Sequence, residues 1–247
     1  MKTYIGIIFP VISLNKTVPM TILNIETSTD VCSVAVTYEG MVLCHREDFS
    51  GHNHATMLSG FIKDCLDHIA THEMKLDAVA VSIGPGSYTG LRIGLSEAKG
   101  LCYALNIPLI GIDTLKTMAV EVMFTQEIEG DELFVPMIDA RRMEVYTAVY
   151  DMALSTLVAP TPLILTPESF DSYLADRRLL IFGNGSDKAR DVITSPNAKF
   201  ISGIHPLAAN MLPLAEQAYM RKEFLDLAYS VPLYLKEFQA TKPKKLF

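Results

Sequence analysis

The order of the predicted elements constrains the fold of this chain more than any single motif does. Three β-rich runs are followed by alternating helices and strands, and the same order then occurs a second time. Runs joined by short turns favour antiparallel pairing, whereas strand–helix–strand units require parallel pairing. We therefore expect an α/β fold with two related halves, each built on a mixed sheet. The predicted strands are 21–26, 31–38, 41–47, 78–83, 108–112, 133–138, 144–150, 157–165 and 179–182, and the predicted helices are 54–71, 89–105, 114–124, 167–175 and 206–221.

A polar, acidic stretch over residues 125–132 separates the two sets of elements. We expect a first domain over residues 20–124 and a second domain over residues 125–247. The second domain ends in a short basic tail, which is either a solvated chain end or a phosphate contact. The basic residues of this tail are Lys236, Lys242, Lys244 and Lys245.

Residues 1–19 precede the first predicted strand. We expect them to be an extension before a start at Met20, because regular structure begins immediately after that residue. The apolar run Tyr4–Leu14 resembles the core of a signal peptide. However, Pro10 interrupts the run, and no small-residue cleavage site follows it.

The composition favours a cytoplasmic globular protein. Of the 247 residues, 49% are hydrophobic and 20% charged, which is ample for buried cores and excludes disorder of the bulk. The net charge of −7 argues against a protein that binds nucleic acid unaided. No apolar run reaches the ~18 residues that span a bilayer. The cysteines lack CxxC spacing and are typical of core residues in a reducing compartment: Cys32, Cys44, Cys65 and Cys102.

The densest motif is the glycine-rich run GPGSYTGLRIG, residues 84–94, between a buried strand and a helix. Its glycines permit close backbone approach, and free amides at a helix start can hold an anion. The spacing is neither GxGxxG nor that of a P-loop. The run is therefore either a phosphate site or a turn that packs the strand against the helix. The residues that we single out are Gly84, Pro85, Gly86, Ser87, Tyr88, Thr89, Gly90 and Arg92.

The helix that follows this motif carries apolar or small residues on nearly every face. Such a helix must be covered on more than one side. One sheet covers only one side, so the second cover is either a helix of the same chain or a partner subunit. Gly94, Ala98 and Gly100 are expected to let another helix come close.

These segments together resemble the bacterial TsaB (YeaZ) family, whose members are partner proteins in tRNA threonylcarbamoyladenosine synthesis. The resemblance covers residues 20 to about 236 and rests on ILNIETS from Ile22, the 84–94 motif, AKGL from Ala98, Ile107-Pro108, DARRMEVY from Asp139 and PLYL from Pro232. It implies the actin/sugar kinase/Hsp70-like fold, with two ribonuclease H-like domains.

The same resemblance implies that the chain lacks the chemistry of the related catalytic subunit, TsaD. The metal-binding HxxxH of that subunit would fall at Thr114 and Met118, and methionine is a poor ligand for a hard ion. Glu26 stands where the family more often has aspartate. A second phosphate loop should be rich in glycine, but the corresponding motif has none. We therefore expect no catalytic residue, metal or cofactor. The residues singled out in this second-domain motif are Asp139, Arg141, Arg142, Glu144 and Tyr146.

Two other patterns favour different chemistry. His68 and His72 have helical HxxxH spacing, which can share a zinc ion, but no third ligand is evident. Members of the family have also been labelled M22 glycopeptidases. Ser87 has a glycine-rich setting, yet no histidine can be assigned as its base.

The function implied is a non-catalytic subunit that binds and activates TsaD, with the TsaE ATPase joining the assembly. Contact with tRNA would run through the complex, and the chain alone would form a homodimer by the same face. The alternative is an independent enzyme of this fold, either ATP-hydrolysing or an M22-type metallopeptidase. Helices 54–71 and 89–105 would carry the partner interface. Its candidate contacts are Leu58, Phe61, Ile62, Leu95, Ala98 and Leu101.

Overall fold

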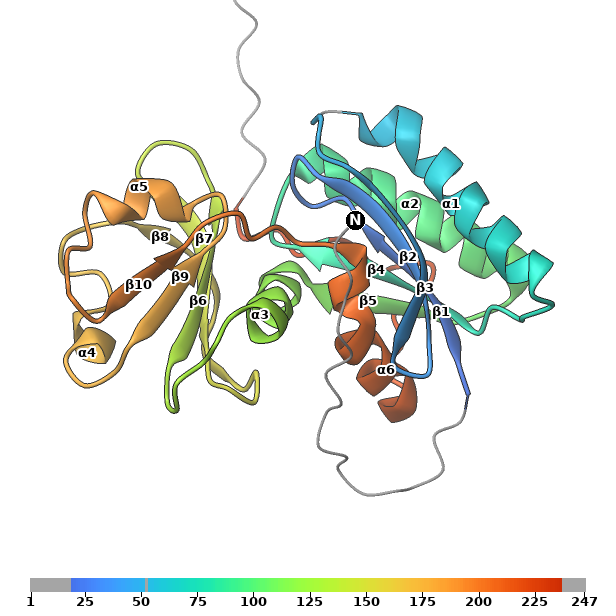
Figure 1. The fold of residues 1–247 in the computed structure, drawn as a ribbon. Coiled ribbons are helices and arrows are strands. Elements are labelled where there is room, and N and C mark those ends of the chain that lie inside the picture. Colours follow the sequence, from blue (N-terminus) through green and yellow to red (C-terminus); the bar gives the residue numbers. More distant parts are fainter. Residues whose placement is uncertain (1–18, 52, 237–247) are drawn as a thin grey trace, which may run out of the picture.

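The computed structural model describes residues 19–51 and 53–236 and contains two five-stranded sheets (Figure 1). The first sheet has the order β3-β2-β1-β4-β5. Its first three strands pair antiparallel, and β4 and β5 pair parallel to β1, as predicted. The strand bounds are β1 Thr21–Glu26, β2 Cys32–Tyr38, β3 Met41–Asp48, β4 Ala78–Gly84 and β5 Leu109–Asp113.

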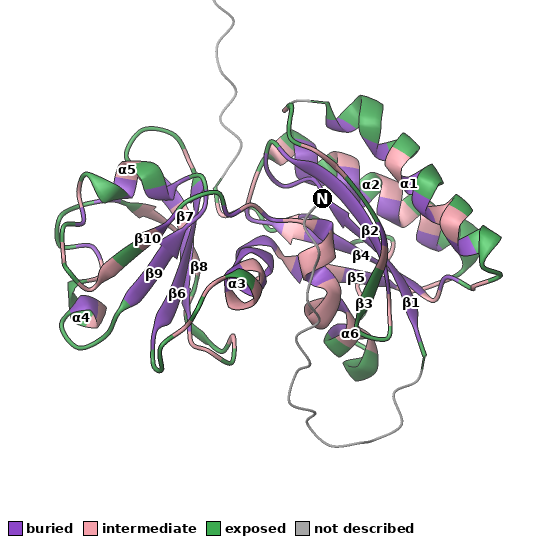
Figure 2. Ribbon diagram, viewed as in Figure 1, coloured by how far each residue is buried: buried purple, intermediate pink, exposed green. Residues whose placement is uncertain are grey.

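Each face of the first sheet is covered by helices. Alternate residues of the central strands point to opposite faces, as the period of a strand requires. Leu23 and Ile25 of β1 pack towards α1 and α2, while Ile22 packs towards the opposite helices. Figure 2 shows the buried strands between these two layers. The helix bounds are α1 His54–Thr71 and α2 Tyr88–Leu105 on one face, with the 3-10 helix η1 Ala208–Met211 and α6 Leu212–Arg221 on the other.

The second sheet repeats the first, with the order β10-β9-β6-β7-β8. Helix α3 covers one face, and the short helices α4 and α5 cover the other. The bounds are β6 Leu133–Asp139, β7 Glu144–Tyr150, β8 Thr156–Ile164, β9 Leu179–Phe182, β10 Ala198–Ile201, α3 Thr114–Thr125, α4 Asp171–Leu174 and α5 Ser186–Arg190. The expectation of two related mixed sheets is confirmed.

Some elements differ from the sequence prediction. The helix predicted over residues 167–175 is reduced to α4, and the helix predicted over 206–221 begins only at Leu212, where Pro213 occupies the first turn. The sequence prediction missed α5 and β10, because they have five and four residues and are too short for a periodic pattern.

One helix from each half of the sequence packs on the sheet of the other half. Helix α3 ends at Thr125, at the expected domain boundary, but packs in the core of the second sheet, while α6 follows this boundary and packs on the first sheet. The extension expected over residues 1–19 lies outside the described residues except for Pro19. In the basic tail, only Lys236 is described.

After α6, residues 225–236 run back along the first sheet, and we call this segment the C-terminal strap. The N–H of Leu225 donates to the carbonyl of Leu109 at 2.8 Å, and the N–H of Leu233 donates to the carbonyl of Ile83 at 2.7 Å. Between these points, Nζ of Lys99 on α2 donates to the carbonyl of Ser230 at 2.7 Å. The strap therefore joins β4, β5 and α2 on one edge of the first sheet.

Candidate functional site

The glycine-rich motif, residues 84–94, connects β4 to α2. Gly84 is the last residue of β4, and a cis peptide bond joins it to Pro85. Helix α2 begins at Tyr88, and Thr89 is exposed in its first turn. The motif therefore lies at the carboxyl end of a parallel strand, where α/β proteins commonly bind ligands.

Two backbone amides at the start of α2, those of Ser87 and Gly90, already have protein partners. Ser87 is the N-cap: its Oγ accepts a hydrogen bond from the N–H of Gly90 at 3.3 Å. The N–H of Ser87 donates to the carbonyl of Ser28 at 2.6 Å. A phosphate cradle needs these donors unpaired and pointing at the anion. The Ser87 hydroxyl therefore acts as a helix cap here and not as a nucleophile.

Close packing accounts for the glycines of the motif. A Cβ at Gly86 would overlap the backbone of Ser28, and a Cβ at Gly90 would overlap the carbonyl oxygen of Thr27. A Cβ at Gly94 would overlap Oγ1 of Thr27, whose hydroxyl donates to the carbonyl of Gly90 at 2.8 Å. The structure thus favours the packing turn over the phosphate site, and Gly94 approaches the β1–β2 turn instead of another helix.

The side chains of Tyr88 and Arg92 in this motif contact the C-terminal strap. The guanidinium of Arg92 lies 4.1 Å from the ring centroid of Tyr88 and 5.7 Å from that of Tyr234. Its Nε donates to the hydroxyl of Tyr234 at 2.8 Å, and the two tyrosine rings lie 5.1 Å apart. Two segments that carried the resemblance are therefore in direct contact, which the sequence analysis did not anticipate because 142 residues separate Arg92 from Tyr234.

Glu26 lies at the end of β1, fully buried beneath this motif. Its Oε1 accepts a hydrogen bond from the N–H of Ser28 at 2.6 Å. Burial raises the pKa of the Glu26 carboxyl, and hydrogen bonds from Ser28 and Ser82 oppose this rise. The charged form is therefore disfavoured in the folded protein.

We expect replacement Glu26→Gln to flatten the dependence of stability on pH. A carboxyl whose pKa is raised on folding contributes stability that is fully present below its unfolded value, 4.5, and is lost as the pH rises through the folded value. Glutamine keeps an oxygen for the N–H of Ser28 but does not titrate. Urea unfolding at about pH 5 and about pH 8 should show a smaller loss of stability in the variant than in the wild type. Equal losses in the two proteins would contradict this assignment.

The second-domain motif forms the hairpin between β6 and β7. Lys188 of α5 forms an ion pair with Asp139 and donates hydrogen bonds to the carbonyls of Arg142 and Glu144. Oδ1 of Asn184 accepts from the N–H of Asp139 at 2.9 Å. A lysine ammonium therefore binds the carboxylate and two carbonyls of this loop, in place of the phosphate that a glycine-rich loop would hold.

The other members of this motif point in different directions. Arg141 and Arg142 have positive φ angles of 70° and 50°, and both are exposed. Two successive non-glycine residues in this region store backbone strain. The Glu144 carboxylate pairs with Lys236 of the C-terminal strap, which ties the strap to the second domain. Tyr146 is partly buried against the core of the second sheet.

The two HxxxH-like positions do not form a metal site. Thr114 and Met118, both on α3, are buried in the protein interior. The rings of His68 and His72 lie 4.3 Å apart, and Nδ1 of His72 lies 2.8 Å from the carbonyl oxygen of His68. Within residues 19–51 and 53–236, no cluster of three or more histidine, cysteine or carboxylate side chains is arranged to hold a metal.

A small cavity separates the two domains. Thr29 and Asp30 line it from the first domain, Asn184 from the second, and His205 from the segment that leads back to α6. Its volume is about 200 Å³. Small-molecule sites usually measure ~300–1,000 Å³. The cavity is therefore smaller than a usual small-molecule site.

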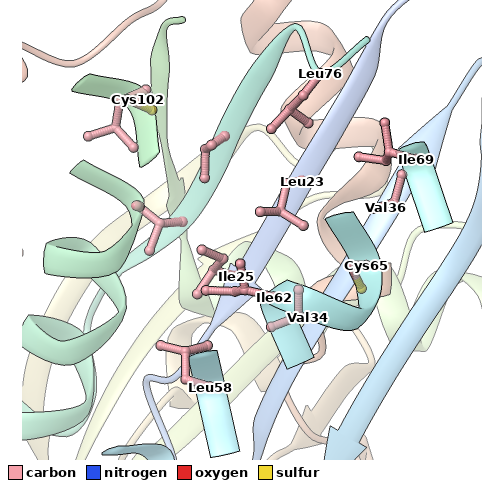
Figure 3. Packing of buried hydrophobic residues seen from close by; sticks show 14 of the residues in the cluster. Leu23, Ile25, Val34, Val36, Leu58, Ile62, Cys65, Ile69, Leu76 and Cys102 are labelled. Atoms are coloured by element: carbon pink, nitrogen blue, oxygen red, sulfur yellow. The ribbon is translucent and has the colours of Figure 1, made fainter. Parts of the chain in front are cut away.

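The predicted partner contacts divide into two groups. Leu58, Ile62, Leu95 and Ala98 belong to the core beneath α1 and α2, where each is at most 5% exposed. Figure 3 shows Leu58 and Ile62 pointing from α1 into the core of the first sheet. The assignment of these four residues as surface contacts is therefore wrong, because they form the stripe that faces the sheet.

Phe61 and Leu101 remain partly exposed at the edge of that core. The outer face of the two helices is formed by other residues, and we call it the α1/α2 face. Its exposed small and apolar members are Met57, Ser59, Gly60, Ser96, Gly100 and Tyr103, and the exposed ion pair of Lys63 with Asp67 lies one turn further along α1. Figure 2 shows the exposed residues along the outer side of α1.

A family model and two curated proteins that match this chain all belong to tRNA threonylcarbamoyladenosine synthesis. A family model described as TsaD, tRNA N6-adenosine threonylcarbamoyltransferase, matches residues 48–235. The tRNA threonylcarbamoyladenosine biosynthesis protein TsaB of Escherichia coli is 31% identical to the chain and covers 90% of it, with 97% of that protein matched. TsaB of Bacillus subtilis is 30% identical over 90% of this chain and 96% of its own length. The chain belongs to the TsaB family.

Solved structures support this assignment. A protein from Pseudomonas aeruginosa described as similar to peptidase YEAZ has a TM-score of 0.74 and 30% identity, covering 88% of this chain and all of that one. The expected fold class, an α/β fold of the actin/sugar kinase/Hsp70-like type with two ribonuclease H-like sheets, is confirmed. Membership of the TsaB family gives the chain a role in the tRNA threonylcarbamoyladenosine pathway.

Among the described helices, none combines the length and apolar character needed to cross a bilayer.

Proposed function

We propose that this chain is a non-catalytic, cytoplasmic subunit that binds TsaD through the α1/α2 face. The bound chain would stabilise the TsaD conformation that transfers threonylcarbamoyl to the target adenosine of tRNA. The ATPase TsaE would join this assembly, and tRNA would be contacted mainly by the partner. Alone, the chain would pair with a second copy by the same face.

The composition of the α1/α2 face supports this proposal. At Gly60 on α1 and Gly100 on α2, an added Cβ would meet no described atom within 4 Å. Small residues let the backbones of two packed helices approach closely, at interaxial distances near ~8 Å. Met57 and Tyr103 are 37% and 83% exposed beside these glycines, and they would supply apolar contact area. A matching helix pair from a partner would complete a four-helix bundle.

The match to a TsaD family model supports the choice of partner. A TsaD-like protein and this chain then share one fold, so each presents equivalent helices. Two similar surfaces can pair about a pseudo-twofold axis, as identical subunits do about a true one. This is the observation on which the choice of TsaD rests.

The surroundings of the motifs support a non-catalytic role. The amides of Ser87 and Gly90 bind protein atoms, and Lys188 fills the corresponding loop of the second domain. These amides and this loop, which a nucleotide-dependent relative would direct at a phosphate, therefore have structural partners here.

Co-purification with TsaD tests the proposal. We expect Ser96→Arg, on the α1/α2 face, to weaken binding at least about tenfold, which is ~1.4 kcal/mol. The matched control is Ser172→Arg, an exposed serine on α4 of the second domain, which should bind as the wild type does. Equal binding by both variants would reject this face. Micromolar binding of ATP–magnesium by the isolated chain, measured by calorimetry, would instead support an independent enzyme.

A further inference from the structure

Two of the cysteines lie in contact beneath the helix layer. Cys44 is on β3, at the edge of the first sheet, and Cys65 is on the inner side of α1. Their sulfur atoms are 3.6 Å apart, and the Cys65 thiol donates towards Sγ of Cys44. Figure 3 shows Cys65 among the buried side chains of this core. A disulfide between them would bring the sulfurs to about 2.05 Å.

An ion pair beside the two thiols joins the same elements. Nε of Arg46 on β3 lies 2.9 Å from Oδ2 of Asp64 on α1, the residue that precedes Cys65. Nη1 of Arg46 also donates towards Sγ of Cys44 at 3.7 Å. Arg46 therefore helps to align the helix with the strand beside the two thiols.

The four cysteines differ in their readiness to react. Cys44 is 9% exposed, whereas Cys65 is completely buried. Burial raises the pKa of Cys65 to about 12 and the pKa of Cys32 and Cys102 to about 11. The thiol of Cys102 donates to the carbonyl of Pro108 at 3.4 Å instead of to a second sulfur. Cys44 is thus the thiol that an oxidant reaches first, and Cys65 is the sulfur beside it.

We propose that Cys44 and Cys65 form a redox-active pair that a peroxide closes into a disulfide between β3 and α1. The Cys44 thiolate attacks one peroxide oxygen, the O–O bond breaks, and a sulfenic acid forms while the other oxygen leaves as water with the thiol proton. The Cys65 sulfur then attacks Sγ of Cys44, so that an S–S bond forms and the S–O bond breaks. The Cys65 proton leaves with this oxygen as a second water. Two thiols lose two electrons, which reduce one peroxide to two waters.

This bond would lock the edge strand to the helix that carries part of the α1/α2 face. The chain between Cys44 and Cys65 would become a closed loop, which restricts the unfolded state more than the folded one. We expect the melting temperature to rise by about 5–10 °C on oxidation. A thiol reductant should reverse the rise, because the product is an ordinary disulfide.

The test is peroxide titration of the full-length, reduced chain. The four thiols should fall to two when they are counted in denaturant, and peptide mapping without reductant should show Cys44 joined to Cys65. Dithiothreitol should restore all four. The proposal is overturned if four thiols remain, if the bond joins other cysteines or two chains, or if Cys44 is oxidised further without a crosslink.

Matched serine variants separate the pair from the other cysteines. Cys102→Ser should lose two of its three thiols under peroxide, as the wild type loses two of four. Cys44→Ser should keep three, and circular dichroism will show whether it remains folded. If Cys44→Ser loses two thiols as well, the crosslink lies elsewhere and the assignment fails. The wild-type peptide map decides the matter even if a variant does not fold.

Discussion

Replacement Ala98→Arg is expected to unfold the first domain. Ala98 is completely buried in the core between α2 and the first sheet. A guanidinium placed there would lose its hydration without gaining a carboxylate partner, and its volume would displace neighbouring side chains. Such a burial should cost more than about 4 kcal/mol, a large part of the ~5–15 kcal/mol that stabilises a typical domain. Far-UV circular dichroism and thermal unfolding would measure the loss.

The control for this prediction lies two residues earlier in the same helix. Ser96 is exposed, so Ser96→Arg should change the free energy of unfolding by less than about 0.5 kcal/mol. The same variant should bind TsaD at least about tenfold more weakly, which separates the stability of the helix from the proposed use of its outer face. A wild-type melting temperature in Ala98→Arg would mean that the buried stripe of α2 has been assigned incorrectly.

Replacement Gly90→Ala should have the second-largest effect. Its Cβ would overlap the carbonyl oxygen of Thr27, a backbone atom that cannot rotate away. The first turns of α2 would have to move outward, and the hydrogen bond from Thr27 Oγ1 to the carbonyl of Gly90 would weaken. We expect a loss of about 2–4 kcal/mol in chemical denaturation.

A second glycine of α2 provides the comparison. Gly100 has open space around it, so Gly100→Ala should stabilise the chain by about 0.5–1 kcal/mol through its higher helix propensity. The two substitutions add the same methyl group to one helix and should have opposite signs. Similar losses in both variants would show that close packing on Thr27 is not the reason for the glycine at position 90.

Much of the fold could be predicted from the sequence, because strands and helices leave periodic patterns. The sequence could not predict which face of α2 packs against the sheet. This helix carries apolar residues on nearly every side, so more than one face could be the buried one. The structure shows that Leu95 and Ala98 are buried and that Tyr103 is exposed. The predicted partner contacts were chosen for their apolar character. Apolar residues are also the ones that the core buries, so four of the six lie in the core.

The role of the glycine-rich motif could not be decided locally either. Its glycines are explained by Thr27 and Ser28, which lie about sixty residues earlier in the chain and meet the motif only after β1 and β4 have paired. The contact of Lys188, on α5, with the β6–β7 hairpin also depends on long-range folding. Each answer required distances between segments that a local pattern does not contain.

The return of the chain to the first sheet has a consequence for biosynthesis. Gly40 binds Glu216 across 176 residues, and Lys99 binds the strap across 131. While the ribosome is still making the second domain, the nascent first sheet has one apolar face without η1 and α6. The first sheet is therefore completed only after the second domain has been synthesised, and one of its apolar faces stays uncovered until then.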